Sequence, residues 1–206
     1  MHISEGILSG PVLTGGWALT LAGLGIGVKR LKEHEIPKAA VIASAFFVAS
    51  LVHVPVGPSS AHMLLIGLSG LLLGWVCFPV MFVALLLQAI LFQFGGIVVL
   101  GVNTLIMALP AVAVSLLFRK VISHGSRKLA TVFSFLSGVA GVFFSAILCS
   151  LALLFTEKNF LKTAQLILAA HIPVMILEGI LTVFVISYLG KVKPEFLGES
   201  GGRDEK

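Results

Sequence analysis

The sequence predicts an all-α polytopic membrane protein, a bundle of about seven transmembrane helices. Of its 206 residues, 58% are hydrophobic and 11% are charged, whereas a soluble domain carries about 25% charged residues. Mean hydropathy is +1.10, and apolar runs near the ~20 residues that a bilayer requires follow one another along the chain. The net charge of +5 comes from basic residues in short loops between these runs, which argues against a nucleic-acid-binding face.

Each apolar run gives one expected span, and breaker residues separate them. Gly95 and Gly96 separate the fourth span from the fifth, and a tight turn at 77–79 separates the third from the fourth. The expected spans are residues 10–28, 37–55, 61–78, 79–95, 97–118, 129–155 and 164–190.

The distribution of Lys and Arg predicts the orientation. With the N-terminus outside and the C-terminus cytoplasmic, twelve of the fourteen basic residues fall in inner segments, and only Lys158 and Lys162 remain outside. Residues 1–190 then form a transmembrane domain, and residues 191–206 form a short polar cytoplasmic tail.

Small and soft residues inside the spans are expected to serve packing. The Gly-x-x-x-Gly pairs at 23–27 and 70–74 let helices approach closely. Cys77 and Cys149 both lie in apolar runs without a CxxC pattern, so we expect buried or lipid-facing thiols rather than a disulfide or a metal site.

Four of the six histidines fall at the expected outer face: His2, His53, His62 and His171. A single histidine near a membrane interface is most simply a hydrogen-bonded packing residue. Four at one face together indicate a cation site, because imidazole suits Ni, Co, Cu and Zn. The other two, His34 and His124, lie in basic inner loops, where solvated side chains are expected.

The first two residues offer a chelate that no internal histidine can form. The Met1 amine, the His2 amide nitrogen and the His2 imidazole can bind one metal in fused five- and six-membered rings. An α-amine with a reference pKa of about 7.7–8.0 gives up its proton readily to a metal near neutral pH. One further imidazole completes a square plane of nitrogens, which is typical of Ni(II) or Cu(II).

The fourth ligand is expected from the segment HVPVGPSSAHMLL, residues 53–65. Its Pro-Gly-Pro turn stiffens the loop that presents His62, and Ser59 or Ser60 can cap the third helix. His53 competes for the ligand position, or it hydrogen-bonds a ligand without itself binding the metal.

Four segments resemble the CbiM/NikM-type substrate-specific components of energy-coupling-factor transporters for cobalt and nickel. They are MHISEGIL, GPSSAH, LLLQAILFQFGGIVVLGVNTLIMALP and AHIPVMILEG. The terminal MHI motif together with the GPSSAH turn is the specific part of the likeness, which covers nearly the whole chain except the tail.

The resemblance implies a fold and a ligand set. A seven-helix component would draw its N-terminal segment into the bundle, and the ligands would be the Met1 amine, the His2 amide and imidazole, and the His62 imidazole. Gln93 and Asn103 match the central polar segment of the family. They would line the site or stabilise the loop between spans four and five, and helix-to-helix hydrogen bonds are an equally good reading.

The resemblance also implies partners in a prokaryotic inner membrane: a transmembrane scaffold protein, a cytoplasmic ATPase and a small auxiliary membrane protein. The chain itself has no Walker A motif. We therefore expect a transport subunit and not an enzyme, with Ni²⁺ or Co²⁺ as the transported substrate and no prosthetic group.

Glu178 is the only acid inside an expected span, which makes it a functional candidate. It follows His171 by about two helical turns, so both share one helix face. It either makes a structural hydrogen bond to a neighbouring helix or belongs to the metal path.

Two other function classes find less support. A self-sufficient secondary transporter or channel is expected to show internal repeats and charged midplane residues, and neither is evident. A metalloprotease would need HExxH, but KEHEIPK at 32–38 lacks the second histidine. Nickel and cobalt both remain open as the metal, and the sequence does not show how copper would be excluded.

Overall fold

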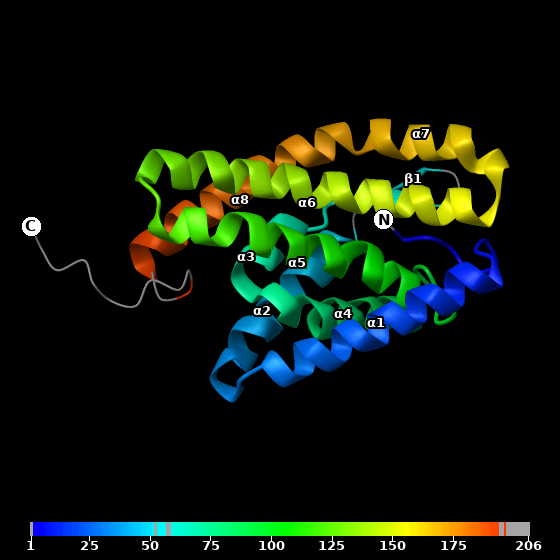
Figure 1. Ribbon diagram of the computed structural model, residues 1–206, viewed down its shortest axis with the longest axis horizontal. Helices are drawn as coiled ribbons and strands as arrows, with labels where there is room; N and C mark the ends of the chain where they lie inside the picture. The colour runs from blue at the N-terminus through cyan, green and yellow to red at the C-terminus, as the bar shows by residue number, and fades with distance from the viewer. Residues whose placement is uncertain (1, 52, 57–58, 194–195, 197–206) are drawn as a thin grey trace, which may run out of the picture.

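The computed structural model describes residues 2–51, 53–56, 59–193 and 196, and it describes residues 53–55 by their backbone alone. Helices dominate this part of the chain, and α6 packs against both α5 and α8 along the bundle (Figure 1). The elements are α1 (Gly10–Arg30), η1 (Glu33–Glu35), α2 (Ile36–Ala49), β1 (His53–Val56), β2 (Ser59–His62), α3 (Ile66–Leu73), η2 (Gly74–Val76), α4 (Cys77–Phe92), α5 (Leu100–His124), α6 (Arg127–Thr156), η3 (Lys158–Phe160), α7 (Leu161–Ala170) and α8 (Ile172–Val192).

Local sequence explains where the long helices begin and end. α1 has a proline in its first turn, where no backbone N–H is lost, and Lys29 and Arg30 in its last turn, where they complement the helix dipole. α6 begins at a conventional cap, because the side chain of Ser126 accepts a hydrogen bond from the backbone N–H of Leu129.

Within the described residues, five helical stretches have the length and the apolar composition to cross a membrane, although two of them consist of more than one helix. They are Gly10–Arg30, Ile66–Phe92, Leu100–His124, Arg127–Thr156 and Lys158–Val192. α2 has 14 residues, so it is about 21 Å long and shorter than the ~30 Å apolar core of a bilayer. The number of seven spans stays a prediction, but the helical membrane architecture is confirmed.

A short β-hairpin lies where the sequence predicted the end of the span 37–55 and the beginning of the span 61–78. Both of those predicted boundaries were therefore wrong. β1 pairs with β2 in antiparallel register, with His53 opposite His62 and Val56 opposite Ser59. The physical reason is that a chain inside a membrane must pair its backbone groups internally, and two short strands do so where proline prevents a helix. Every residue of β2 is buried.

The chain reverses at η2, three residues before the turn expected at 77–79. His62, just before α3, and Gln88, near the end of α4, both contact His2, so the two arms return to the same place. Gly74 has a φ of +56°, which a glycine adopts without strain. Cys77 is therefore the first residue of α4 and is not part of the turn.

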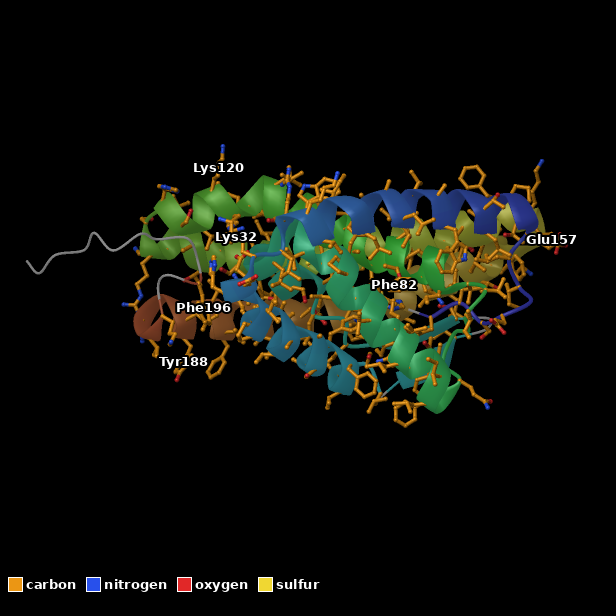
Figure 2. The ribbon with its side chains drawn as sticks, turned by 90° about the horizontal axis from the view of Figure 1, so that it is seen from below. Lys32, Phe82, Lys120, Glu157, Tyr188 and Phe196 are labelled. Carbon is orange, nitrogen blue, oxygen red and sulfur yellow. The ribbon has the colours of Figure 1, made fainter. Side chains whose placement is uncertain are left out.

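Two further boundaries differ from expectation. The span expected at 164–190 is broken at His171 into α7 and α8, because Pro173 in the first turn of α8 prevents a continuous helix. Arg119, Lys120 and His124 lie in the last turns of α5 and not in a loop. Figure 2 shows Lys32 and Lys120 at one end of the bundle, which we call the basic end, and Glu157 at the opposite end.

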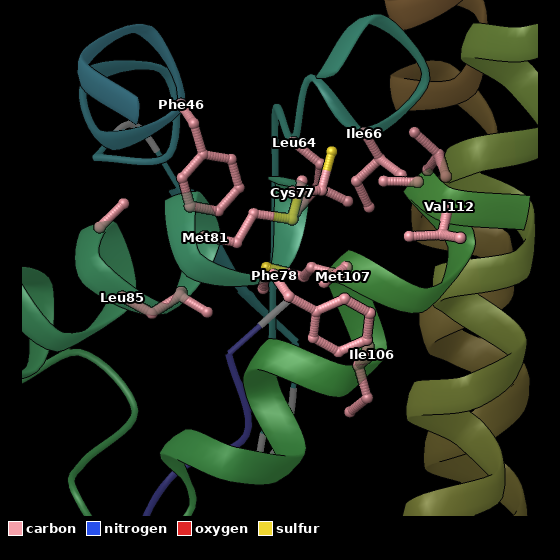
Figure 3. Packing of buried hydrophobic residues seen from close by; sticks show 14 of the residues in the cluster. Phe46, Leu64, Ile66, Cys77, Phe78, Met81, Leu85, Ile106, Met107 and Val112 are labelled. Atoms are coloured by element: carbon pink, nitrogen blue, oxygen red, sulfur yellow. The ribbon is translucent and has the colours of Figure 1, made fainter. Parts of the chain in front are cut away.

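The core is built where α2, α3, α4 and α5 meet (Figure 3). Phe46, Phe78 and Met107 are among its largest fully buried side chains. Close helix approach is confirmed at Gly23 and Gly70, because a side-chain carbon at Gly23 would collide with Phe78 and one at Gly70 with the backbone of Ala111. Gly74 instead belongs to η2, and a side-chain carbon there would meet nothing closer than 3.4 Å. The two cysteines are buried, as predicted, and are free thiols.

Candidate metal centre

The N-terminal segment runs from the start of α1 back into the bundle and is held there by its backbone (Figure 1). Asn103 of α5 accepts a hydrogen bond from the Ile3 N–H at 2.9 Å and donates one to the Ile3 carbonyl at 3.0 Å. The Glu5 N–H donates to the Gly95 carbonyl at 3.0 Å, and the Glu5 carboxylate accepts from the Val98 N–H at 2.8 Å. These bonds fix the position of residue 2.

Gly95 has no room for a side chain. Its φ is +76°, and a side-chain carbon there would lie 2.8 Å from the Asn103 amide nitrogen and 3.7 Å from the His2 ring. The glycine pair between α4 and α5 therefore lets the N-terminal segment approach closely, in addition to breaking the helix as expected.

Two imidazoles meet at the inner end of this segment. His2 is 7% exposed and His62 is 3% exposed. The Nε2 atom of His62 lies 3.0 Å from the Nδ1 atom of His2, and the ring centroids are 4.7 Å apart. The structure thus brings together two histidines that are 60 residues apart in the sequence.

Gln88 fixes the tautomer of His2. Its amide nitrogen donates to the Phe47 carbonyl and to the Ser50 hydroxyl, so its amide oxygen is left as an acceptor 2.8 Å from Nε2 of His2. His2 consequently carries its proton on Nε2, and Nδ1 is an acceptor nitrogen.

The tautomer of His62 is fixed in the same manner. Its Nδ1 donates to the Met63 carbonyl at 2.9 Å, so its Nε2 is an acceptor nitrogen. Burial lowers the pKa of His62 well below its usual value of 6.5, which keeps the ring neutral near pH 7. The Nδ1 atom of His2 and the Nε2 atom of His62 therefore face each other at 3.0 Å, and a proton or a metal ion between them would offset the repulsion of their lone pairs.

The separation of these nitrogens agrees with coordination of one metal. With metal–nitrogen bonds of about 2.0 Å, neighbouring ligands lie about 2.8 Å apart in a square plane and about 3.3 Å apart in a tetrahedron. The observed 3.0 Å lies between these values. No group of three or more His, Cys, Asp or Glu side chains able to hold a metal occurs in the described part of the chain.

Glu178 of α8 holds the turn that follows His62. Its Oε1 atom accepts hydrogen bonds from the backbone N–H groups of Leu64 and Leu65, each at 2.5 Å. Leu65 has a left-handed φ of +49°, a conformation that costs a leucine energy and needs support from its surroundings. Glu178 itself is 0% exposed. Its carboxylate accepts from the backbone of a turn and not from a side chain of a neighbouring helix.

His171 lies between α7 and α8 and is also 0% exposed. Its Nδ1 donates to the Ile167 carbonyl at 2.7 Å. Among the residues described, nothing hydrogen-bonds its Nε2.

The other residues singled out from the sequence have other positions. Ser59 and Ser60 belong to β2 and do not cap α3, since Leu65 precedes that helix. Ser60 instead accepts from the His2 N–H at 3.5 Å. Gln93 is exposed and ends α4 with a φ of +58°. Met1 and the side chain of His53 lie outside the described residues.

Gln88 was missed by the sequence analysis. A signal existed, because it is the one amide in the otherwise apolar helix Cys77–Phe92, and a polar residue inside a membrane helix is a functional candidate. Nothing in the sequence, however, connects it with His2, which lies 86 residues away.

Comparison with known proteins agrees with this geometry. Residues 2–196 match the model of the CbiM family, the cobalt uptake substrate-specific transmembrane region. A Haemophilus influenzae protein named for metal transport is 44% identical over 202 residues, covering 97% of this chain and 98% of its own. The cobalt transport protein CbiM of Clostridium tetani is 31% identical, covering 98% and 89%. The crystal structure of a transition metal transporter superposes with a TM-score of 0.76 and 28% identity, covering 93% of both chains.

Proposed function

This chain belongs to the CbiM family of transmembrane components for cobalt and nickel uptake, and from that premise we propose that it is the substrate-binding subunit of an energy-coupling-factor transporter. It captures Ni²⁺ or Co²⁺ at the outer face of the membrane and delivers the ion to the cytoplasm. The energy comes from a cytoplasmic ATPase, reached through a transmembrane scaffold protein and assisted by a small auxiliary membrane protein.

The observation that supports this proposal most strongly is the 3.0 Å approach of His2 Nδ1 to His62 Nε2. A six-membered chelate ring closed by the amide nitrogen of His2 needs Nδ1 and not Nε2 of the same residue. Gln88 occupies Nε2, so the available nitrogen is the one that the chelate requires.

The proposed ligands are the Met1 amine, the His2 amide nitrogen, His2 Nδ1 and His62 Nε2. The His2 N–H donates a long hydrogen bond of 3.5 Å to the Ser60 hydroxyl. Four nitrogens in one plane favour nickel, and cobalt shares the same donors. Asn103 and Gly95 hold the segment that brings the terminus to His62.

Glu178 acts in this proposal as a positioning residue. It fixes Leu64 and Leu65 and through them the ring of His62. Because Glu178 belongs to α8, a tilt of that helix against the hairpin would displace His62 from the metal. Movement of the bundle driven by the ATPase can therefore release the ion without a chemical step in this chain.

The experiment that tests this function is metal analysis of the purified protein with two residues, Gly-Ser, added before Met1. Two residues are needed, because a single one would place the histidine third in the chain and create a different four-nitrogen chelate. The same Gly-Ser pair added after Lys206 is the matched control.

The native protein and the control are expected to bind near-stoichiometric nickel or cobalt, and the N-terminal extension is expected to abolish it. If the extended protein is folded and still binds the metal with the native spectrum, the terminal chelate is wrong.

A further inference from the structure

A second cavity lies far from the imidazole pair, at the basic end of the bundle. It has a volume of about 330 Å³ and lies where the end of α1, η1, η2 and the second half of α5 meet. We call it the basic-end cavity. Arg30, Arg119 and Lys120 line it, together with the indole of Trp75 and the hydroxyl of Ser115.

The charges around the basic-end cavity do not balance. Glu35 is the one acid in its wall, and Glu35 is already paired with Lys38 at 3.4 Å. Within the described part of the chain, Arg30, Arg119 and Lys120 form no ion pair. Three cations around one hollow favour an anion with several oxygen acceptors.

The cavity wall is shaped to keep the hollow open. Gly74, with its left-handed φ of +56°, leaves the space between η2 and α5 unfilled. A side-chain carbon there would lie 3.4 Å from the Ser115 hydroxyl and 4.0 Å from the Arg119 guanidinium. The Arg30 guanidinium lies over the Trp75 ring, 5.6 Å from its centroid, a contact that orients its N–H groups.

The apolar surface next to the cavity indicates the source of the anion. Leu116, which lines the cavity, is 68% exposed, and its neighbour Leu117 is 57% exposed. Such leucines face acyl chains in a membrane, while Trp and Arg at helix ends lie at the headgroup level. Figure 2 shows Lys120 at the end of the bundle together with Lys32.

We propose that the basic-end cavity binds the phosphate group of an anionic phospholipid whose acyl chains lie along Leu116 and Leu117. A free phosphate would meet the same cations but would gain nothing from the exposed leucines. Basic pockets between membrane helices are known to select anionic headgroups. This proposal is independent of the metal site, because none of its residues contacts His2 or His62.

The test measures the thermal unfolding midpoint of the full chain in a nonionic detergent with added phosphatidylglycerol, phosphatidylcholine, inorganic phosphate or a poly-glutamate peptide. Phosphatidylglycerol is expected to raise the midpoint by about 2–4 °C or more. For a chain of this length, such a shift corresponds to a change of about fivefold in the folding equilibrium constant. Phosphatidylcholine and inorganic phosphate are expected to have little effect.

Arg119→Gln is expected to lose the phosphatidylglycerol shift, and Arg127→Gln is the matched control. Arg127 is exposed in the first turn of α6 and does not line this cavity. If Arg119→Gln does not fold, the exposed Arg30→Gln variant carries the same expectation.

Four outcomes would overturn the proposal. They are an equal shift with phosphatidylcholine, an equal shift with inorganic phosphate, an equal loss in Arg127→Gln, or stabilisation by a poly-glutamate peptide but not by phosphatidylglycerol. The last result would assign the cavity to an acidic protein segment instead.

Discussion

His62 and His171 are two buried imidazoles with similar local surroundings and different neighbours. Each donates its Nδ1 proton to a backbone carbonyl, at 2.9 Å for His62 and 2.7 Å for His171. His62 Nε2 faces the ring of His2. His171 Nε2 has no hydrogen-bond partner in the described part of the chain.

The difference shows that burial and a fixed tautomer do not by themselves define a ligand. Both histidines have these properties, but the N-terminal segment supplies a second nitrogen only to His62. That segment depends on Asn103 and Gly95, which hold its backbone. The proposed site therefore depends on the placement of the N-terminal segment rather than on a cluster of side chains.

The largest expected effect comes from the same substitution at both histidines. Asparagine can reproduce the Nδ1–H donor of histidine but has no Nε2. His62→Asn is therefore expected to lose metal binding by more than the about 10–100-fold typical of residues that only support a ligand. His171→Asn is expected to bind metal as the native protein does. Isothermal titration with Ni²⁺ measures both, and equal losses would place His171 among the ligands.

The pH dependence of nickel affinity distinguishes the terminal chelate from a site of imidazoles alone. Binding must release one proton from the amide and, below the reference amine pKa of about 7.7–8.0, a second one from the amine. Affinity should therefore rise about 100-fold per pH unit below that pKa and about tenfold above it. Because burial lowers the pKa of His62, this ring is neutral above pH 7 and does not contribute to the pH dependence of the nickel affinity. A flat profile between pH 7 and 9 would contradict the chelate.

Substitutions of Glu178 test whether the turn after His62 positions the imidazole of that residue. Glu178→Gln keeps an oxygen that can accept from Leu64 and Leu65, and Glu178→Leu removes it. The leucine variant leaves two buried N–H groups unpaired, at about 1–3 kcal/mol of folding stability each. It should also weaken metal binding and alter the visible spectrum, whereas the glutamine variant should retain the native spectrum. A spectrum unchanged in the leucine variant would reduce Glu178 to a structural role.

The smallest effect is expected at Gln88. Gln88→Leu leaves the ligands in place but removes the acceptor that keeps the His2 proton on Nε2. A loss of about 10–100-fold in nickel affinity is expected from such an outer partner. Gln93→Leu, an exposed amide at the end of the same helix, is the control and should bind normally. Equal affinities for the two variants would show that the tautomer of His2 is not set by Gln88.

Much of this arrangement follows from the sequence because it rests on local chemistry. The amine of residue 1 and the imidazole of residue 2 lie next to each other in any fold, and His62 was identifiable because it follows the Pro-Gly-Pro segment. The helical class and most span positions followed from hydropathy. Close approach at Gly23, Gly27 and Gly70 was also predictable.

What could not be predicted depends on contacts between distant segments. The hairpin was missed because four-residue strands have no hydrophobic period that distinguishes them from a helix end. The turn at η2 lies three residues earlier than predicted, because Gly74 accepts a positive φ and Pro79 fits within the first turns of α4. Glu178 was a candidate, but its partners, two backbone N–H groups 113 and 114 residues away, are beyond any sequence pattern.

The most direct measurement is X-ray absorption at the nickel edge of the metal-loaded protein, native and with Gly-Ser added before Met1. Four nitrogen ligands in a square plane are expected for the native protein, and this signal is expected to be lost in the extended protein. A six-coordinate, oxygen-rich nickel in the native protein, or an identical square plane in both, would contradict the terminal chelate.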